Sequence, residues 1–290
     1  MKRRLINQQS EPRSRETAKT LRQSVKARIM MALFALMLIP QVAWAQGDVD
    51  YMGYDTTTGK FVKTRVTSGN YTTLTGNSST SLTAGTTYVV TGTETMNNRL
   101  KVVGTGMVNI ILCDGATFTA NWGITVSTGH VLNIYAQSEG TGKLIAKGID
   151  DAGTLYAAIG GVQSGSTHNT PADYGFVNIY GGQITADASS ITGASGIGAF
   201  DYSTSCVTTI YGGNVDAMGG PSDPTTNTNI PTYGIANLKL GSGVIYYGGS
   251  SPNPTTDVAY GPQSSISTLY RYMSTKENVY DLTVDGKQDD

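Results

Sequence analysis

Short apolar segments recur along the chain, separated by glycine-rich turns. Each segment has four or five residues in which apolar and polar positions alternate, which is the period of a half-buried β-strand and not of a helix. Successive copies are spaced by 24 to 45 residues, as in repeat architectures. The clearest copies centre on one large aliphatic residue: Ile110, Ile134, Ile179, Ile210 and Leu240.

Two further segments follow most of these centres, so a repeat contains three expected strands. A turn such as Gly181-Gly182 or Gly212-Gly213 precedes the second strand, where glycine permits a positive φ. Strands of successive repeats should stack about 4.8 Å apart and bury columns of equivalent residues. Besides the five centres, we expect three buried columns: Phe118, Leu144, Ile184, Val215 and Ile245; Ile124, Ile159, Ile197 and Ile235; and Ala120, Ala146, Ala186 and Ala217.

This pattern predicts an all-β fold, a three-sided right-handed parallel β-helix of about five to six coils over residues 86–250. Residues 46–85 lie outside the repeat, and segments 49–52 and 61–64 flank a turn, so we expect an N-terminal β-hairpin that caps the end of the stack. Residues 251–290 should form a C-terminal cap and tail. An antiparallel β-sandwich also uses short strands and glycine turns, but it does not require residue-by-residue columns.

The first 45 residues have the order of a signal peptide. A basic segment precedes an apolar run from Ile29 to Ile39, and Ala43-Trp44-Ala45 supplies a small-residue cleavage pattern. The run is shorter than the roughly 20 residues of a membrane span, so we expect cleavage after Ala45, export to the exterior or the outer cell surface, and no stable membrane span afterwards. The long basic segment leaves an uncleaved anchor as the alternative.

Charge and cysteine content narrow the functional classes. Nine of the 20 Lys and Arg and two of the 21 Asp and Glu lie in residues 1–45, so the remainder carries a formal charge of −8. A basic nucleic-acid footprint is therefore absent. Cys113 and Cys206 lie three coils apart in the expected register, about 14 Å along the axis. A disulfide requires Cα atoms within about 7 Å, so we expect two free thiols.

The repeat resembles a known family. Asn178-Ile179-Tyr180-Gly181-Gly182 and Ser195-Gly196-Ile197-Gly198 are similar to the repeats of secreted surface β-helix proteins of Bacteroides and Prevotella-type bacteria, over roughly residues 86–250. More remotely the chain looks like the pectate-lyase superfamily. The resemblance implies the fold and an exported location. It implies no catalytic residue, because that family is mostly without assigned activity and fold does not imply function.

A search for catalytic chemistry finds no clear site. The most lyase-like grouping is Lys143 with the Asp150-Asp151 loop. The alternative is that Lys143 is a solvated charge at a strand edge with no catalytic role. Acidic side chains could instead hold a weak structural Ca²⁺, which takes oxygen ligands, although solvated surface acids are the commoner case. We therefore expect no catalytic residue and no cofactor, with one possible calcium set: Asp150, Asp151, Asp187, Asp201 and Asp216.

One outward column is more informative. Tyr135, Tyr180 and Tyr211 follow the inward isoleucines, and Asn133 and Asn178 precede them. Three rings on successive coils, edged by amides, would suit the C–H faces and hydroxyls of sugars, and Tyr180→Ala should then weaken binding with little change in stability. The alternative is an aromatic ladder that only stabilises the sheet.

These observations favour an exported, non-enzymatic module that binds a polysaccharide or a host or matrix surface. A polysaccharide lyase or glycoside hydrolase is one alternative, and a structural stalk or spacer is another. An open tyrosine column would favour the binding module. A column covered by the N-terminal segment would favour the spacer.

Overall fold

A computed structural model describes residues 47–164, 174–198, 207–221, 233–249, 251–252, 254, 257–260, 263–266 and 271–277. Every regular element in these ranges is a β-strand, which confirms the all-β prediction. No helix in them is long and apolar enough to cross a membrane. The chain divides into two units, Met1–Gly47 and Asp48–Asp290, and the second is described below. The expected signal peptide, Asp201 and Cys206 lie outside the described residues.

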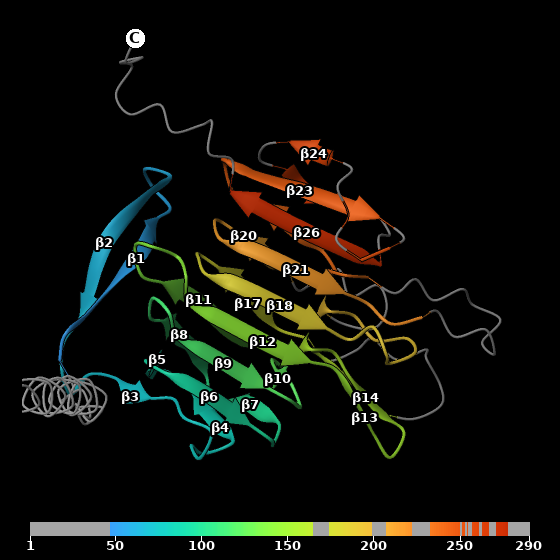
Figure 1. The fold of residues 1–290 in the computed structure, drawn as a ribbon, viewed down its shortest axis with the longest axis horizontal. Coiled ribbons are helices and arrows are strands. Elements are labelled where there is room, and N and C mark those ends of the chain that lie inside the picture. Colours follow the sequence, from blue (N-terminus) through green and yellow to red (C-terminus); the bar gives the residue numbers. More distant parts are fainter. Residues whose placement is uncertain are drawn as a thin grey trace, which may run out of the picture. The chain divides into compact units, whose positions relative to one another are not determined.

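Three sheets built around parallel strands make up most of the second unit (Figure 1). We call them sheets I, II and III. In chain order, sheet I contains β3 (Thr72–Thr73), β5 (Thr87–Val90), β8 (Gly106–Leu112), β11 (His130–Ala136), β17 (Phe176–Ile179), β20 (Thr208–Ile210), β22 (Leu238–Leu240) and β25 (Gln263–Ile266). Sheet II contains β6 (Thr93–Met96), β9 (Thr117–Ala120), β12 (Lys143–Lys147), β18 (Gln183–Asp187), β21 (Asn214–Met218), β23 (Val244–Gly249), β24 (Asp257–Tyr260) and β26 (Tyr272–Glu277). Sheet III contains β4 (Ser81–Thr83), β7 (Leu100–Val103), β10 (Ile124–Thr125), β15 (Ile159–Gly160) and β19 (Ile197–Gly198).

From β5 to β23 the chain visits the three sheets in a repeating order, I, then II, then III. Neighbouring strands within each sheet are parallel up to β22 in sheet I and β21 in sheet II. This pairing argues against an antiparallel sandwich. The parallel pairing also starts earlier than expected, because β3 and β4 lie in the range 46–85 that we assigned to the cap.

The predicted columns form the core. Ile134 pairs with Ile110 and Ile179, and Ile179 pairs with Ile210, and all four side chains have no exposed surface. The isoleucines of sheet III stack in the same way, with Ile197 bridging to Ile235. Stacking puts equivalent side chains above one another, so each repeat buries the apolar face that it could not bury alone.

One member of the columns is predicted wrongly. In β23, Val244 and Tyr246 are buried and Ile245 is only partly buried. The cause is β26, which lies between β21 and β23 and pairs antiparallel with both. Because side chains alternate between the faces of a strand, a shift of one residue exchanges the inward and outward sets.

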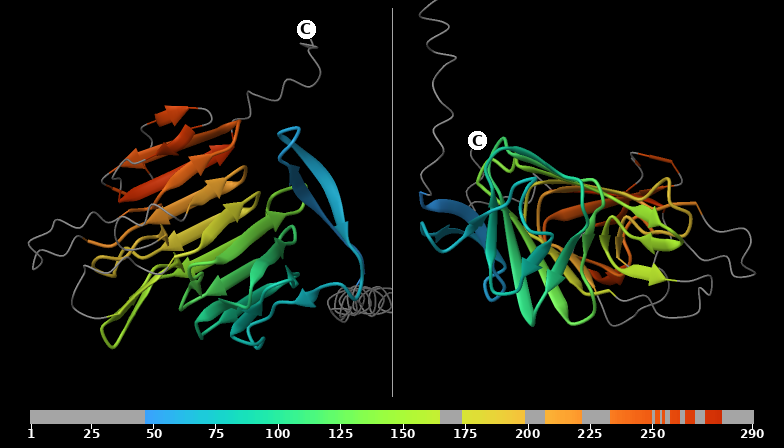
Figure 2. Two further views of the ribbon diagram at one scale, coloured as in Figure 1. Left: turned by 180° about the vertical axis from the view of Figure 1, so that it is seen from behind. Right: turned by 90° about the horizontal axis from the view of Figure 1, so that it is seen from below.

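Segments outside the three sheets form two small antiparallel sheets. β1 (Val49–Asp55) pairs with β2 (Lys60–Val66) as the expected hairpin. The insertion after β12 forms a three-stranded sheet of β13 (Ile149–Asp151), β14 (Thr154–Tyr156) and β16 (Val162–Ser164). We expected the hairpin to cap the end of the stack, but it does not. It lies beside the middle strands of sheet I (Figure 2), where Tyr51 contacts the ring of Tyr135.

Candidate functional site

The three tyrosines stack on one another by their faces. Tyr135 and Tyr180 have ring centroids 4.6 Å apart and planes 5° from parallel, and Tyr180 and Tyr211 have centroids 4.8 Å apart and planes 1° from parallel. Side chains at equivalent positions on neighbouring strands repeat at the strand spacing, so the three rings form a face-to-face stack. A sugar platform needs exposed ring faces. The prediction that these residues form a flat, open platform is therefore wrong.

The hairpin covers the column of tyrosines from outside. Tyr51 packs edge-on against Tyr135, with centroids 5.0 Å apart, and Tyr54 lies 4.4 Å from Tyr211 and 6.2 Å from Tyr180. Burial raises the pKa of the Tyr180 phenol to about 12 and raises the pKa of Tyr135 as well. The column is therefore a docking surface for β1.

The asparagines beside the tyrosines bond to one another. Asn178 Nδ2 donates to Asn133 Oδ1 at 2.9 Å, and Asn133 Nδ2 donates to Asn109 Oδ1 at 2.9 Å. The ladder ends where Asn109 Nδ2 donates to Thr87 Oγ1 at 3.3 Å. Asn133 is buried. Because these amides supply hydrogen bonds within the sheet, the structure does not present Asn133 as the open ligand contact that we predicted.

Charged and polar groups hold the hairpin together. Asp50 accepts a hydrogen bond from Arg65 Nε at 2.6 Å and lies 2.8 Å from Lys63 Nζ. The hydrogen bond from Arg65, followed by that from Lys63, keeps the pKa of the Asp50 carboxyl well below its usual value. Exposed pairs of this kind stabilise weakly. Because these pairs join β1 to β2, they do not attach the hairpin to sheet I. That attachment is made by the aromatic contacts of β1 and by Val49, which packs with Val89 and Ile111.

Gln137 connects the hairpin to the body of the protein. Its Nε2 donates to the carbonyl oxygen of Asp50 at 3.0 Å, and its Oε1 accepts from the backbone N–H of Asp114 at 2.8 Å. Gln137 opens the turn between β11 and β12. Gln137 thus fixes the hairpin to the turn between β11 and β12, and residues of this turn also line a cleft.

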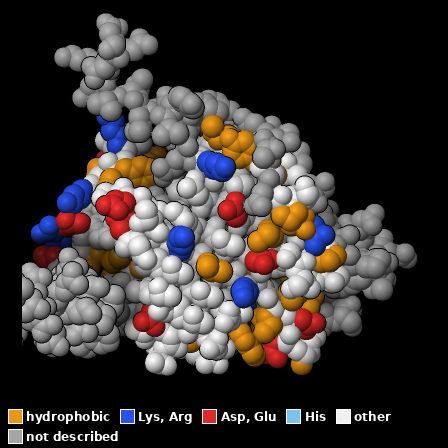
Figure 3. All heavy atoms as spheres, in the orientation of Figure 1, with side chains coloured by type: hydrophobic (Ala, Val, Ile, Leu, Met, Phe, Trp, Pro, Cys, Tyr) orange, Lys and Arg blue, Asp and Glu red, His pale blue; other side chains and the backbone are white. Residues whose placement is uncertain are grey.

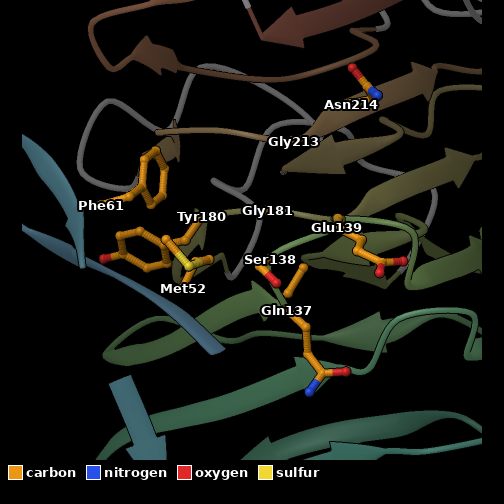
Figure 4. Close-up of a pocket in the computed structure, with 12 residues that line it drawn as sticks. Met52, Phe61, Gln137, Ser138, Glu139, Tyr180, Gly181, Gly213 and Asn214 are labelled. Carbon is orange, nitrogen blue, oxygen red and sulfur yellow. The ribbon is translucent and has the colours of Figure 1, made fainter. Parts of the chain in front are cut away.

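The cleft lies between the hairpin and the corner that joins sheets I and II, with a volume of about 380 Å³. In Figure 4, Phe61 and Met52 of the hairpin gather near Tyr180, while Glu139 and Asn214 lie toward the other side. The full lining consists of Met52, Phe61, Ala136, Gln137, Ser138, Glu139, Gly140, Tyr180, Gly181, Gly182, Gly213 and Asn214. An apolar wall therefore faces a polar one.

Glycines shape the floor of the cleft. Gly182 has φ +92° and Gly213 has φ +85°, and a Cβ on Gly213 would lie 2.6 Å from the carbonyl oxygen of Gly182. The corners of successive repeats therefore stack backbone on backbone, as only glycine permits. Glu139 and Asn214 are exposed beside this floor, and within the described residues neither side chain has a hydrogen-bond partner. They are available to a ligand.

The four predicted acidic residues that the structure describes are not brought together. Asp150 accepts from the backbone N–H of Gly153, and Asp187 accepts from that of Ser189, both at 2.9 Å. Asp216 accepts from Ser274 Oγ at 2.6 Å. Asp151 lies beside Asp150 on β13, while Asp187 and Asp216 belong to β18 and β21. Among the described residues, no group of three or more His, Cys, Asp or Glu could hold a metal ion.

Figure 3 shows the acidic groups of the visible face as separate patches on a largely uncharged surface. The proposed lyase-like grouping is also dispersed, because Lys143 begins β12 whereas Asp150 lies beyond its end. Residues 144–149, which include the rest of β12, separate them along the chain. A shared base and metal site at this position would need a different arrangement of the strand and its insertion.

Sequence reasoning missed most of the cleft. Phe61 and Glu139 are 78 residues apart in the sequence, and they line the same cleft only because the hairpin docks on sheet I. The available signal was Phe61-Val62, an adjacent apolar pair near the start of a strand whose next residues, Lys63, Thr64 and Arg65, are polar or charged. Comparison with family models, with curated proteins and with solved structures finds no match for this chain.

Proposed function

We propose that this chain is an exported, non-enzymatic parallel β-helix that binds polysaccharide in the cleft beside its N-terminal hairpin. The observation that carries the proposal is the composition of the cleft, in which Phe61, Met52 and Tyr180 face Glu139 and Asn214. Sugars present apolar C–H patches and hydroxyls on the same ring, so a two-sided cleft of this kind matches their chemistry.

The three-sided, right-handed coil is part of the proposal. It is supported by the repeating order in which the chain visits sheets I, II and III. Connections between parallel strands are right-handed in nearly all proteins. Sheet II contains five strands that pair in parallel, β6, β9, β12, β18 and β21, and β23 continues their order along the chain. One such strand per coil gives about six coils.

Export is supported by the sequence of residues 1–45, which we propose are removed after Ala45 to leave a protein outside the cell or on its surface. The remaining chain carries a net negative charge, and the cleft contains the carboxylate of Glu139. Both argue for a neutral glycan over nucleic acid. We propose that this glycan belongs to a polysaccharide or to a host or matrix surface. No cofactor is required for binding of this kind.

Replacement of Phe61 tests the cleft. Phe61→Ala should lower the affinity for a glycan identified on an array by about two- to tenfold, because an aromatic contact contributes roughly 0.5–1.5 kcal/mol. Val62→Ala is the matched control, since Val62 is the exposed neighbour on the same strand and does not line the cleft. Equal affinities of the two variants, measured by calorimetry, would refute the cleft as the binding site.

A structural spacer is the second candidate, and the covered tyrosine column favours it. On this hypothesis the hairpin and the asparagine ladder serve to stiffen the stack. The spacer predicts no glycan binding by the mature protein at millimolar ligand, together with full retention of the fold. Turnover of a polysaccharide, detected as new reducing or unsaturated ends, would instead establish the lyase or hydrolase alternative.

A further inference from the structure

Strand β26 occupies a slot in sheet II that is absent from the other two sheets. It lies between β21 and β23 and pairs antiparallel with both (Figure 1). On sheet I the equivalent strands β20 and β22 pair directly and in parallel, and on sheet III Ile197 bridges directly to Ile235. One side of the last repeat is therefore held open by one strand, about 4.8 Å wide.

The repeat spacing competes with this arrangement. Ile184 follows Ile179 by five residues and Val215 follows Ile210 by five residues, and both are buried. The same interval after Leu240 reaches Ile245, yet with β26 in place Tyr246 is the buried residue. The spacing thus favours a register of β23 that differs by one residue from the register beside β26, and such a slip exchanges the two faces of the strand.

The fit of β26 is also imperfect. Thr275 pairs with Val215 on one side and Tyr246 on the other, and all three point into the core. The Thr275 hydroxyl is buried and has no hydrogen-bond partner among the described residues, an arrangement that disfavours the folded state. Removing β26 therefore costs less than removing a strand with a fully apolar inner face.

We propose that this slot is a strand-exchange site, through which two copies of the chain pair by each donating β26 to the other. The occupant must be antiparallel, must place Met273 and Thr275 inward, and must bring a hydroxyl to Asp216, as Ser274 does. A second copy meets each requirement with identical contacts, which is the condition for domain swapping. The connection from β23 to β26 contains β24 and β25, which pair with β23 and β22, so the exchange that we propose also releases these two short strands. Residues 250–271 can then span up to about 70 Å, enough to reach a neighbouring molecule.

A cysteine pair distinguishes the two positions of β26. Asp216 and Ser274 are register partners whose side chains meet on the outer face, and Cα atoms of antiparallel partners lie about 4.5–5.5 Å apart, within disulfide range. The variant Asp216→Cys/Ser274→Cys, made with Cys113→Ser and Cys206→Ser, is oxidised at increasing protein concentration and separated without reductant. Exchange predicts disulfide-linked dimers whose fraction rises with concentration.

The pair Thr185→Cys/Asp216→Cys is the matched control, because Thr185 and Asp216 are partners on β18 and β21, which do not exchange. It should yield monomers only. An intramolecular bond as the only product of the Asp216/Ser274 pair at every concentration would overturn the proposal. Unmodified protein gives a second readout: mixed isotope-labelled and unlabelled copies should form mixed dimers by native mass spectrometry, and purely monomeric protein would equally refute exchange.

Discussion

Tyr54 of β1 packs against Tyr211, which directly follows β20, with ring centroids 4.4 Å apart and planes at 35°. These residues are separated by more than 150 positions in the sequence. Their contact places the hairpin over the stacked tyrosines and creates one wall of the cleft. An isolated two-stranded hairpin is marginally stable in water, so this docking also stabilises β1 and β2.

The stacked column predicts a stability effect opposite to the one expected of an open platform. Tyr180→Ala removes face contacts to Tyr135 and Tyr211 and the contact to Tyr54. We expect the free energy of unfolding to fall by about 2–3 kcal/mol, since aromatic pairs contribute roughly 0.5–1.5 kcal/mol each. Urea titration of the purified protein measures the change.

Phe176→Ala is the control for this experiment. Phe176 begins β17, the strand that Tyr180 directly follows, and it is 38% exposed. None of the ring pairs in the described residues includes it. Its replacement should cost less than about 1 kcal/mol, as for other partly exposed surface residues. Similar losses for the two variants would show that the tyrosine stack contributes nothing specific.

The partly buried phenols predict a loss of stability at high pH. Burial raises the pKa of Tyr180 from its usual value near 10 to about 12, so the folded protein holds this proton more tightly than the unfolded chain. The stability is complete below about pH 10 and falls as the pH rises from 10 to 12, because the unfolded state ionises first. Denaturant midpoints across this range test the direction.

Tyr180→Phe removes one of these late-titrating groups and should lessen the alkaline loss. The tyrosinate absorbance of the folded protein should rise in two phases, the second above pH 11. A single phase near pH 10 before unfolding begins would contradict a buried column.

Cys113 is a half-buried free thiol in the structure. Burial, followed by the charge of Asp114, raises the pKa of the thiol to about 11. Since the thiolate is the reactive form, a Cys206→Ser variant should be alkylated at pH 8 roughly 100-fold more slowly when folded than in urea. Equal rates would contradict the burial of Cys113.

The expected absence of a Cys113–Cys206 disulfide remains a prediction, because Cys206 lies outside the described residues. Mass spectrometry of the non-reduced, digested protein tests it. A crosslinked peptide pair would refute the register that places these residues three coils apart.

The sequence by itself determined the repeat and its core. Ile134, Ile179 and Ile210 could be aligned in advance because the faces of a strand alternate with a period of two and because glycine marks each corner. Both signals depend only on neighbouring residues in the sequence, so they can be recognised without knowing which distant segments are in contact. The hairpin was predictable for the same reason, from two apolar segments around a turn.

Only the tertiary structure decided where the distant segments go. Docking of Tyr54 on Tyr211 covers the tyrosine column, and insertion of β26 exchanges Ile245 for Tyr246 in the core. The cleft exists because Phe61 is brought to Glu139 and Asn214. Each outcome depends on the free energy of contacts between residues far apart in the chain, and no local periodicity encodes which of the available surfaces a terminal segment will cover.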